Sequence, residues 1–369
     1  MYGAEVALAL MARFPGCQIF GLGGQRMRQA GVELEGDIQH TAAMGPLAAF
    51  SQLGELFKVF RRLADRVEIA PPDAAILIDF PDFNLRLAKR LKAVNIPVIY
   101  YISPQVWAWR PGRVKQIKEL VTKMLVIFPF EEKIYKDAGV AVEFVGHPLI
   151  ENVRATKTKE EFCRVAALDP QRSILAVLPG SRKKEIRHIL PTLCDVVERV
   201  RSVKPDTQFV LPMAADLDRT LIEDIVGTHP IRLIHGDTYN ALRYARAAIV
   251  ASGTATLEAA LLGTPEVIVY RISPVEAWFL DKFFLKVRLF GIVNIILGEE
   301  VVPELFQDRF TPELVSEAAV RLMDDVWLQS QIRAKYEILR RQLGGGKVAE
   351  RVANAVAEAV NLEPSQRKG

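Results

Sequence analysis

Cysteine is scarce in this sequence, which has 369 residues but only Cys17, Cys163 and Cys194. The three cysteines are far apart, odd in number and without a Cys-x-x-Cys pair. This pattern argues against a disulfide framework or a cysteine zinc site, and it favours a reducing compartment. The five histidines show no metal-ligand spacing with acids or cysteines either. We therefore expect neither a metal nor another cofactor.

The sequence also lacks a signal peptide and any apolar run long enough to span a bilayer. Its net charge of +4 is too small to indicate nucleic acid as a partner. These absences predict a cytoplasmic protein, although one that can touch a membrane surface. The hydrophobic share of 50% and the charged share of 25% are typical of folded domains, and the length allows two of them.

An opening strand is missing as well. Residues 1–13 already have the pattern of a helix, whereas an α/β domain normally begins with a strand that leads through a glycine turn into its first helix. Either this fold begins with a helix, or its first strand and turn are absent.

Short, continuously apolar runs alternate with helical patterns along the whole chain. Such runs are typical of strands buried on both faces of a parallel sheet. The repeated βαβ order predicts an α/β protein with two doubly wound sheets. The predicted strands are Gln18–Leu22, Ala74–Asp79, Val98–Ile102, Met124–Ile127, Glu143–Val145, Ile174–Leu178, Gln208–Leu211, Ile231–Ile234, Ala248–Ala251 and Glu266–Tyr270. The predicted helices include Leu53–Val67, Leu85–Val94 and Ile186–Val203.

The boundary between the two domains is expected in the polar, charged segment Glu151–Asp169, which has no strand pattern. We predict an N-terminal domain over residues 1–160 and a second domain over 161–345. A glycine-rich break then leads into a C-terminal helix and tail over 346–369.

The segment Ile249–Tyr270 reads as a buried strand, a Ser252-Gly253-Thr254 turn, a helix and a second buried strand. The helix directs unpaired backbone N–H groups toward the turn and can hold an anion without a metal. The carboxyl end of a strand is also where open α/β sheets bind ligands. The turn therefore predicts a site for a phosphate or diphosphate.

Two further residues belong with this predicted anion site. Arg182 follows the strand Ile174–Leu178 and a glycine turn, and its guanidinium is suited to a diphosphate. Glu258 lies one turn into the helix after Thr254, where it either holds ribose hydroxyls or faces solvent.

Asp79 and Asp82 follow the strand Ala74–Ile78, at the carboxyl end where ligands bind. We interpret Asp79 as a general base and Asp82 as part of the acceptor side. Asn84 is interpreted as the cap of the helix that starts at Leu85.

The loop after the next strand carries Trp107, Trp109 and Arg110, which suit a sugar or acyl-chain surface. Packing of the aromatic rings against the protein is the alternative. Residues 278–290 are apolar and basic, typical of a helix that lies in lipid headgroups, or of a core helix with extended lysines. The residues assigned to the lipid side there are Trp278, Lys282, Phe283, Lys286 and Arg288.

Several of these segments resemble, in this order, the motifs of one glycosyltransferase family. They are Asp79–Asn84, Ser103–Arg110, Phe128–Glu131, Gly146–His147, Leu178–Arg182, Ala251–Glu258 and Val293–Leu297. Together they are similar to lipid-A-disaccharide synthase over essentially the whole chain, and the Trp-Ala-Trp-Arg loop is among the most specific of them. The resemblance implies a GT-B fold, in which two Rossmann-like domains face a cleft.

The family joins UDP-2,3-diacylglucosamine to 2,3-diacylglucosamine 1-phosphate (lipid X) with inversion, and releases UDP at the cytoplasmic face of the inner membrane. By resemblance, Asp79 is the base, Asn294 and Arg182 hold the diphosphate with the Ser252–Thr254 amides, and Glu258 lies on the nucleoside side. Asn294 and the substrates enter only through the resemblance. Family members open with a strand and a Gly-Glu-x-Ser-Gly-Asp turn that are absent here, so we expect weaker activity and reduced stability.

Two other functions stay open at this point. One is another UDP-sugar enzyme of the same fold, such as a 2-epimerase, which fold alone does not exclude. The other is a truncated, non-catalytic protein that binds nucleotide or lipid. The pattern also leaves an oligomer possible.

Overall fold

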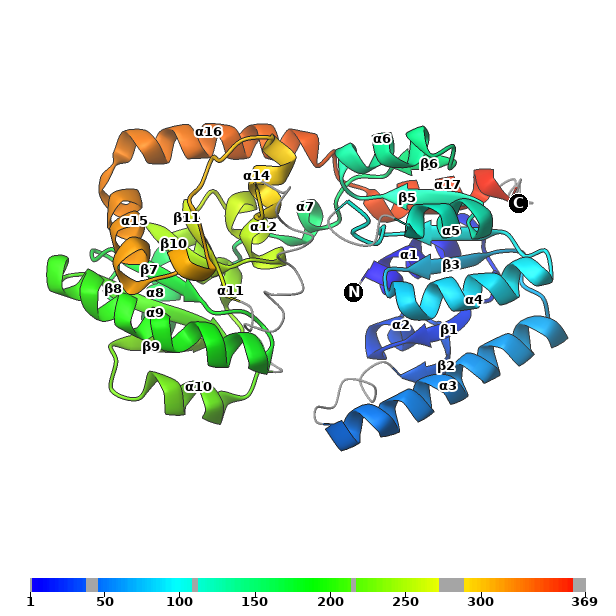
Figure 1. The fold of residues 1–369 in the computed structure, drawn as a ribbon, viewed down its shortest axis with the longest axis horizontal. Coiled ribbons are helices and arrows are strands. Elements are labelled where there is room, and N and C mark those ends of the chain that lie inside the picture. The colour runs from blue at the N-terminus through cyan, green and yellow to red at the C-terminus, as the bar shows by residue number, and fades with distance from the viewer. Residues whose placement is uncertain (1, 38–45, 108–111, 214–216, 272–288, 361–369) are drawn as a thin grey trace. The chain divides into compact units, whose positions relative to one another are not determined.

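The computed structural model describes residues 2–37, 46–107, 112–213, 217–271 and 289–360. The chain forms two compact units. Unit 1 comprises Met1–Pro148 with Leu343–Gly369, and unit 2 comprises Leu149–Gln342. Each unit contains a parallel sheet between helices (Figure 1), which confirms the predicted α/β class.

Unit 1 combines a parallel sheet in the order β3-β4-β5-β6 with a separate parallel pair, β1-β2. The C-terminal helix α17 returns to this unit and packs against α1, β4 and β5, while α4 covers β3 and β4. The elements are α1 Tyr2–Arg13, β1 Phe20–Gly23, α2 Gln25–Gln29, β2 Glu33–Asp37, α3 Pro46–Ile69, β3 Ala75–Ile78, α4 Pro81–Ala93, β4 Val98–Tyr101, α5 Arg113–Leu120, β5 Lys123–Val126, α6 Pro129–Asp137, β6 Val142–Phe144 and α17 Val348–Ala359.

The core of unit 1 follows from the spacing of apolar residues on these helices. Val59, Leu63 and Val67 recur every four residues on α3 and are all buried, so they form one apolar stripe. The same stripe on α4 includes Leu87 and Leu91, and both helices pack into one cluster with the buried strand β4. All four residues of β4 are buried, as expected for a strand that lies between β3 and β5.

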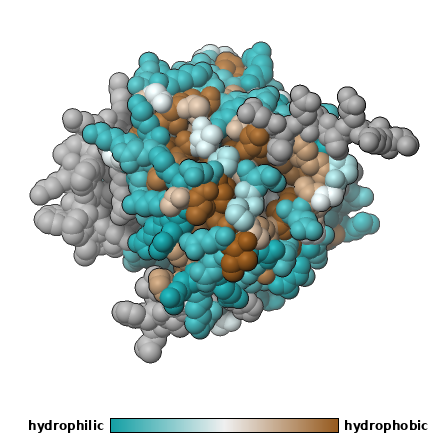
Figure 2. All heavy atoms as spheres, turned by 90° about the vertical axis from the view of Figure 1, so that its right-hand side faces the viewer, coloured by the Kyte–Doolittle hydropathy of each residue, from teal (hydrophilic) through white to brown (hydrophobic). Residues whose placement is uncertain are grey.

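Not every apolar side chain of unit 1 is buried. Leu8 on α1 and Phe57 on α3 are more than half exposed, and Val94 follows the end of α4 at 37% exposure. Figure 2 shows hydrophobic groups that reach the surface among hydrophilic ones on the side where Figure 1 draws unit 1. Helices α1 and α3, and the residue that follows α4, therefore present apolar side chains that the core does not bury.

Strands β1 and β3 both border a cavity of about 1350 Å³. Within the described residues, β1 pairs only with β2 and β3 only with β4. The amide of Ala75 donates to Pro97 beside β4, so the amide of Ile76 faces the opposite edge, because successive groups alternate along a strand. Side chains from α1, α3 and α4 complete the lining. The cavity thus leaves room for one more parallel strand between β1 and β3.

Unit 2 has a six-stranded parallel sheet in the order β12-β11-β10-β7-β8-β9. Helices α9 and α15 pack together, as do α11 and α12. The elements are α7 Leu149–Asn152, α8 Lys159–Ala166, β7 Ile174–Leu178, α9 Lys183–Val203, β8 Gln208–Met213, α10 Arg219–Val226, β9 Ile231–His235, α11 Thr238–Tyr244, β10 Ala247–Ala251, α12 Thr254–Leu261, β11 Glu266–Tyr270, α14 Ile292–Leu297, β12 Glu304–Phe306, the 3-10 turn η2 Gln307–Arg309, α15 Pro312–Asp324 and α16 Val326–Gln342.

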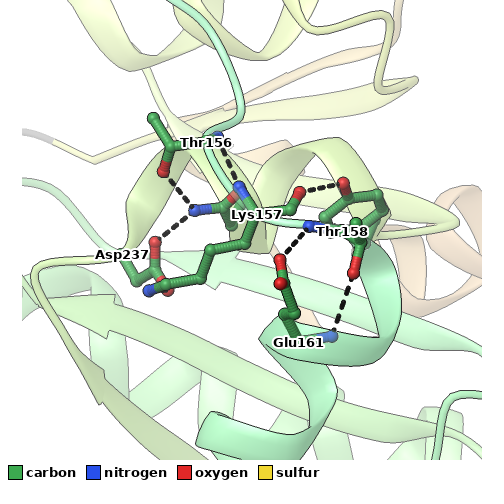
Figure 3. A network of polar contacts seen from close by, with 7 residues as sticks. Thr156, Lys157, Thr158, Glu161 and Asp237 are labelled. Atoms are coloured by element: carbon green, nitrogen blue, oxygen red, sulfur yellow. Dashed lines mark hydrogen bonds and ion pairs between the residues drawn. The ribbon is translucent and has the colours of Figure 1, made fainter.

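The polar segment that precedes α8 is ordered by hydrogen bonds within unit 2 (Figure 3). The buried Asn240 on α11 accepts hydrogen bonds at 3.0 Å from the backbone amides of Thr156 and Lys157. Lys157 Nζ also pairs with Asp237 at 2.5 Å. Thr158 then caps α8 and accepts a hydrogen bond from the Glu161 amide at 3.2 Å. The segment is therefore a fixed part of unit 2.

The predicted strands all lie where the structure has strands, whereas β2 and β12 were not predicted. Strand β2 has the sequence Glu-Leu-Glu-Gly-Asp, whose charges hide its strand character, and β12 has three residues. Both are edge strands, which need neither length nor a continuous apolar run.

A segment of about five β-branched apolar residues with a glycine turn, fused before Met1, is expected to raise the melting temperature. It would pair with the free edges of β1 and β3 and fill the cavity. Thermal unfolding followed by circular dichroism measures the effect. The same extension with a central proline serves as control, because proline cannot donate to the strand ladder. Equal melting temperatures for the two extended chains would contradict the expectation.

Candidate active site

The turn after β3 places Asp79 at the carboxyl end of the strand. Asp79 and Phe80 both adopt left-handed backbone conformations, with φ of 49° and 43°. The Tyr100 hydroxyl donates to the Asp79 carbonyl at 2.6 Å, and the Asn84 amide donates to the same carbonyl at 2.7 Å. Side chains from β4 and α4 therefore hold this strained turn in place.

The predicted capping role of Asn84 is wrong. Helix α4 begins at Pro81, with Phe80 at the cap position, because proline is favoured in the first turn of a helix. Asn84 is buried within the helix, and its amide donates to the carbonyls of Ile78, at 3.1 Å, and Asp79. It thus fastens the helix to the end of the preceding strand.

The Asp79 side chain is exposed, yet its carboxyl group is partly shielded from water. This shielding raises the pKa of Asp79, and a hydrogen bond from the Phe80 amide opposes the rise. A carboxylate with a raised pKa is a better proton acceptor. The geometry and the pKa of Asp79 both suit a general base.

Of the predicted acceptor-side residues, Asp82 and Trp107 are described. Asp82 lies in the first turn of α4 and forms an ion pair with Arg113 of α5. Trp107 packs edge-on against Phe130 of α6, with ring centroids 5.4 Å apart. The other predicted acceptor-side residues lie outside the described residues. They are Trp109, Arg110, Trp278, Lys282, Phe283, Lys286 and Arg288.

A buried polar cluster lies at the ends of β4 and β5, and its members were not singled out by their chemistry. Ser103 Oγ lies 2.7 Å from the Tyr135 hydroxyl. Burial raises the pKa of Glu131 to about 7, while the hydrogen bond from the Phe128 amide and the nearby side chains of Ser103 and Trp107 oppose the rise. The only signal in the sequence was an acid placed inside an otherwise apolar Phe-Pro-Phe-Glu segment.

His147 follows β6 and is buried, with its ring 5.2 Å from that of Phe128. Burial lowers the pKa of His147 to about 4, so its imidazole is neutral at physiological pH. His147 therefore does not provide a positive charge.

In unit 2 the turns after β7 and β10 are neighbours, because these strands pair in parallel with Val250 opposite Leu178. Gly180 has a φ of +111° and Gly253 a φ of +156°, both in the region that favours glycine. A Cβ at Gly180 would lie only 2.5 Å from a Glu185 carboxylate oxygen. Glycine is thus required for both turns to form side by side.

The predicted anion site at the start of α12 has the expected backbone. Gly253 and Thr254 are exposed, the first turn of α12 carries no acid, and no side chain caps it within the described chain. Ser252 is fixed by a hydrogen bond from its amide to the Val269 carbonyl at 2.9 Å. Such an open helix N-terminus favours an anion.

Arg182 stands at the start of α9, beside this turn. Its side chain is 78% exposed and pairs with Glu185 at 2.7 Å. Glu185 also accepts hydrogen bonds from the amides of Ser181 and Arg182. The guanidinium is accessible, but it already has one carboxylate partner.

Glu258 is half-buried on α12 and accepts a hydrogen bond from the Tyr239 hydroxyl at 3.0 Å. Asn294 is fully buried. Its amide nitrogen donates to the Val302 carbonyl and to Glu304, at 2.8 and 2.7 Å, and its oxygen accepts from the amides of Val301 and Val302. A contact with a diphosphate requires a free amide group, whereas that of Asn294 is used within unit 2.

Comparison with known proteins decides the family. The family model described as lipid-A-disaccharide synthetase matches residues 1–360. The chain belongs to this family. The lipid-A-disaccharide synthase of Syntrophus aciditrophicus is 42% identical over 356 residues, which cover 96% of this chain and 93% of the relative. That of Koribacter versatilis is 40% identical and covers 100% of this chain and 96% of the relative.

Membership of the family makes this protein a glycosyltransferase of lipid A biosynthesis with lipid-A-disaccharide synthase activity.

Solved structures support the fold. A putative UDP-N-acetylglucosamine 2-epimerase from Listeria monocytogenes has a TM-score of 0.65 at 13% identity and covers 99% of this chain and 94% of its own. The calicheamicin glycosyltransferase has a TM-score of 0.57 at 17% identity and covers 97% and 94%. The likeness to an epimerase is one of fold only, so the family assignment is preferred to the 2-epimerase alternative.

Replacement of Asn84 by alanine is expected to lower the free energy of unfolding by about 1–3 kcal/mol, because it leaves the Ile78 carbonyl without its side-chain donor. Chemical denaturation monitored by fluorescence measures this change. Arg86→Ala, on the exposed face of the same helix, is the control and should change stability by less than about 0.5 kcal/mol. Equal effects of the two substitutions would show that the hydrogen bonds of Asn84 contribute nothing.

Proposed function

We propose that this enzyme transfers the diacylglucosamine unit of UDP-2,3-diacylglucosamine to lipid X, with inversion and without a metal ion. The products are a β-1,6-linked disaccharide 1-phosphate and UDP. The observation that carries this proposal is the open N-terminus of α12 beside Arg182, because it suits the diphosphate that must leave. The family assignment supports the choice of lipid A precursors as substrates.

Asp79 is proposed as the base that accepts the proton of the acceptor 6-hydroxyl. The hydroxyl oxygen then forms the new bond to the anomeric carbon of the donor sugar, while the bond to the diphosphate oxygen breaks with its electron pair. Attack from the face opposite the leaving group inverts the anomeric centre. The raised pKa of Asp79 supports this role.

The backbone amides of Gly253 and Thr254 are proposed to stabilise the charge that grows on the leaving diphosphate, whereas the Ser252 amide is used by the Val269 carbonyl. Preorganised donors at a helix N-terminus do this without reorganisation during the reaction. Arg182 adds a mobile positive charge, and Glu258 is placed on the nucleoside side. We leave Asn294 out of the diphosphate contacts, and assign it to holding Val301 and Val302 in place.

The apolar, basic segment 278–290 is proposed to bind the membrane surface at the cytoplasmic face of the inner membrane, where the acylated substrates reside. Residues 278–288 of this segment lie outside the described residues, so the argument rests on the sequence. None of the described helices is long and apolar enough to cross a membrane.

Asp79→Asn is expected to reduce the turnover number by about 10²- to 10⁴-fold, since it removes a general base. The assay measures UDP release from UDP-2,3-diacylglucosamine, with and without lipid X, in the presence of EDTA. Asp73→Asn is the matched control, because Asp73 precedes the same strand at its other end and is exposed. Release that needs a metal, or that persists in Asp79→Asn, would defeat the mechanism. Binding of UDP without any turnover would favour the non-catalytic alternative.

The protein is expected to bind vesicles that contain anionic lipid, and to bind them less tightly as salt increases, since exposed charges are screened. Co-sedimentation at two salt concentrations measures this. Replacing Lys282 and Lys286 by glutamine should weaken binding, whereas glutamine at Lys133, which is 84% exposed on α6, should not. Binding that is independent of salt and of both lysines would refute this role of the segment.

A further inference from the structure

The exit of strand β4 is strained. Ile102 has a φ of +66°, a left-handed conformation that is a genuine outlier for a β-branched residue. Such a conformation costs about 1–3 kcal/mol and persists only where the surrounding structure enforces it. The Ile102 amide is held by the Leu125 carbonyl at 3.0 Å, which fixes one side of the turn.

The other side of this turn meets a buried polar cluster on α6. Ser103, the next residue, shares a hydrogen bond of 2.7 Å with the Tyr135 hydroxyl. Glu131, which is 1% exposed, lies against Ser103 and Trp107 and accepts a hydrogen bond from the Phe128 amide at 3.2 Å. The carboxyl group therefore lies between the start of α6 and both ends of the loop formed by residues 103–107.

Capping of α6 is not sufficient to explain the position of Glu131. A glutamate in the first helical turn can accept a backbone hydrogen bond while it remains in water. Glu132, the next residue, shows this arrangement: it accepts from the Phe144 amide at 3.0 Å, pairs with Lys136 and is 30% exposed. Burial of a carboxyl group carries a free-energy penalty, so the burial of Glu131 points to the loop that covers it.

We propose that Glu131 is a positioning residue, which fixes loop 103–107 after β4 in the conformation that binds the lipid-linked acceptor. This inference rests on the proposed assignment of Trp107 to the acceptor side. The same edge of the sheet also carries Asp79, whose carbonyl accepts the Tyr100 hydroxyl of β4. We therefore expect displacement of the loop to weaken acceptor binding more than it changes the position of Asp79.

The test compares Glu131→Ala and Glu131→Gln with Glu132→Ala and Glu132→Gln in the steady-state assay. We expect Glu131→Ala to raise the KM for lipid X by about tenfold, because a lost binding contact appears in KM. The KM for the UDP-sugar should change less than about twofold. Glutamine preserves the shape and acceptor oxygen of the side chain, so Glu131→Gln should restore most of the affinity. Both Glu132 variants should behave like the unaltered protein.

Circular dichroism and melting temperature establish whether each variant is folded. If Glu131→Ala fails to fold, Ser103→Ala replaces it, since it removes the loop hydroxyl that bonds to Tyr135 of α6 and leaves the glutamate. Equal KM values for lipid X in the Glu131 and Glu132 variants overturn the proposal, and so does a rise in the KM for the UDP-sugar alone. Failure of the proposed function is distinguishable, because the unaltered protein would then show no lipid X-dependent UDP release.

Discussion

Parallel pairing of the strands is the constraint on which the chemistry of each unit depends. In a parallel sheet the carboxyl ends of all strands meet at one edge, so the turns that follow them become neighbours. In unit 1 the turns after β3 and β4 bring Asp79 and Ser103 to one edge. In unit 2 the pairing of β7 with β10 does the same for Arg182 and Ser252. Strand pairing alone thus brings residues that are far apart in the sequence to the same edge of a sheet.

The two units form turns with positive φ from different residue types. The proposed anion site of unit 2 is made of backbone amides, and glycine at positions 180 and 253 accepts left-handed φ values without strain. The turn of unit 1 carries Asp79, the proposed base, whose role requires a carboxyl side chain that glycine lacks. Its left-handed conformation is instead held by hydrogen bonds from Asn84 and Tyr100. Because this turn has no glycine, buried polar side chains of β4 and α4 hold its backbone in place.

These differences decide what the sequence could predict. Buried parallel strands are marked by apolar runs, and the Ser252–Thr254 turn by its small residues, so both were found. The start of α4 was misplaced because Asn84 is a good cap in isolation, while Pro81 set the true start. The return of α17 to unit 1 depends on a packing partner that no local pattern contains. The burial of Asn294 likewise depends on Glu304 and its neighbours, which periodicity does not reveal.

Electrostatics explain why an anion would choose α12 over α9, although both helices begin beside the same edge. Glu185 occupies the start of α9: it accepts the amides of Ser181 and Arg182 and neutralises the Arg182 side chain. A diphosphate there would meet a carboxylate and must displace it. The first turn of α12 carries no acid, and its Thr254 is exposed. Since the Arg182 side chain is long and solvated, it can exchange its exposed ion pair, worth at most about 1 kcal/mol, for an anion held on α12. Glu185 thereby keeps the Arg182 side chain close to the site, while the exposed guanidinium stays able to bind an anion.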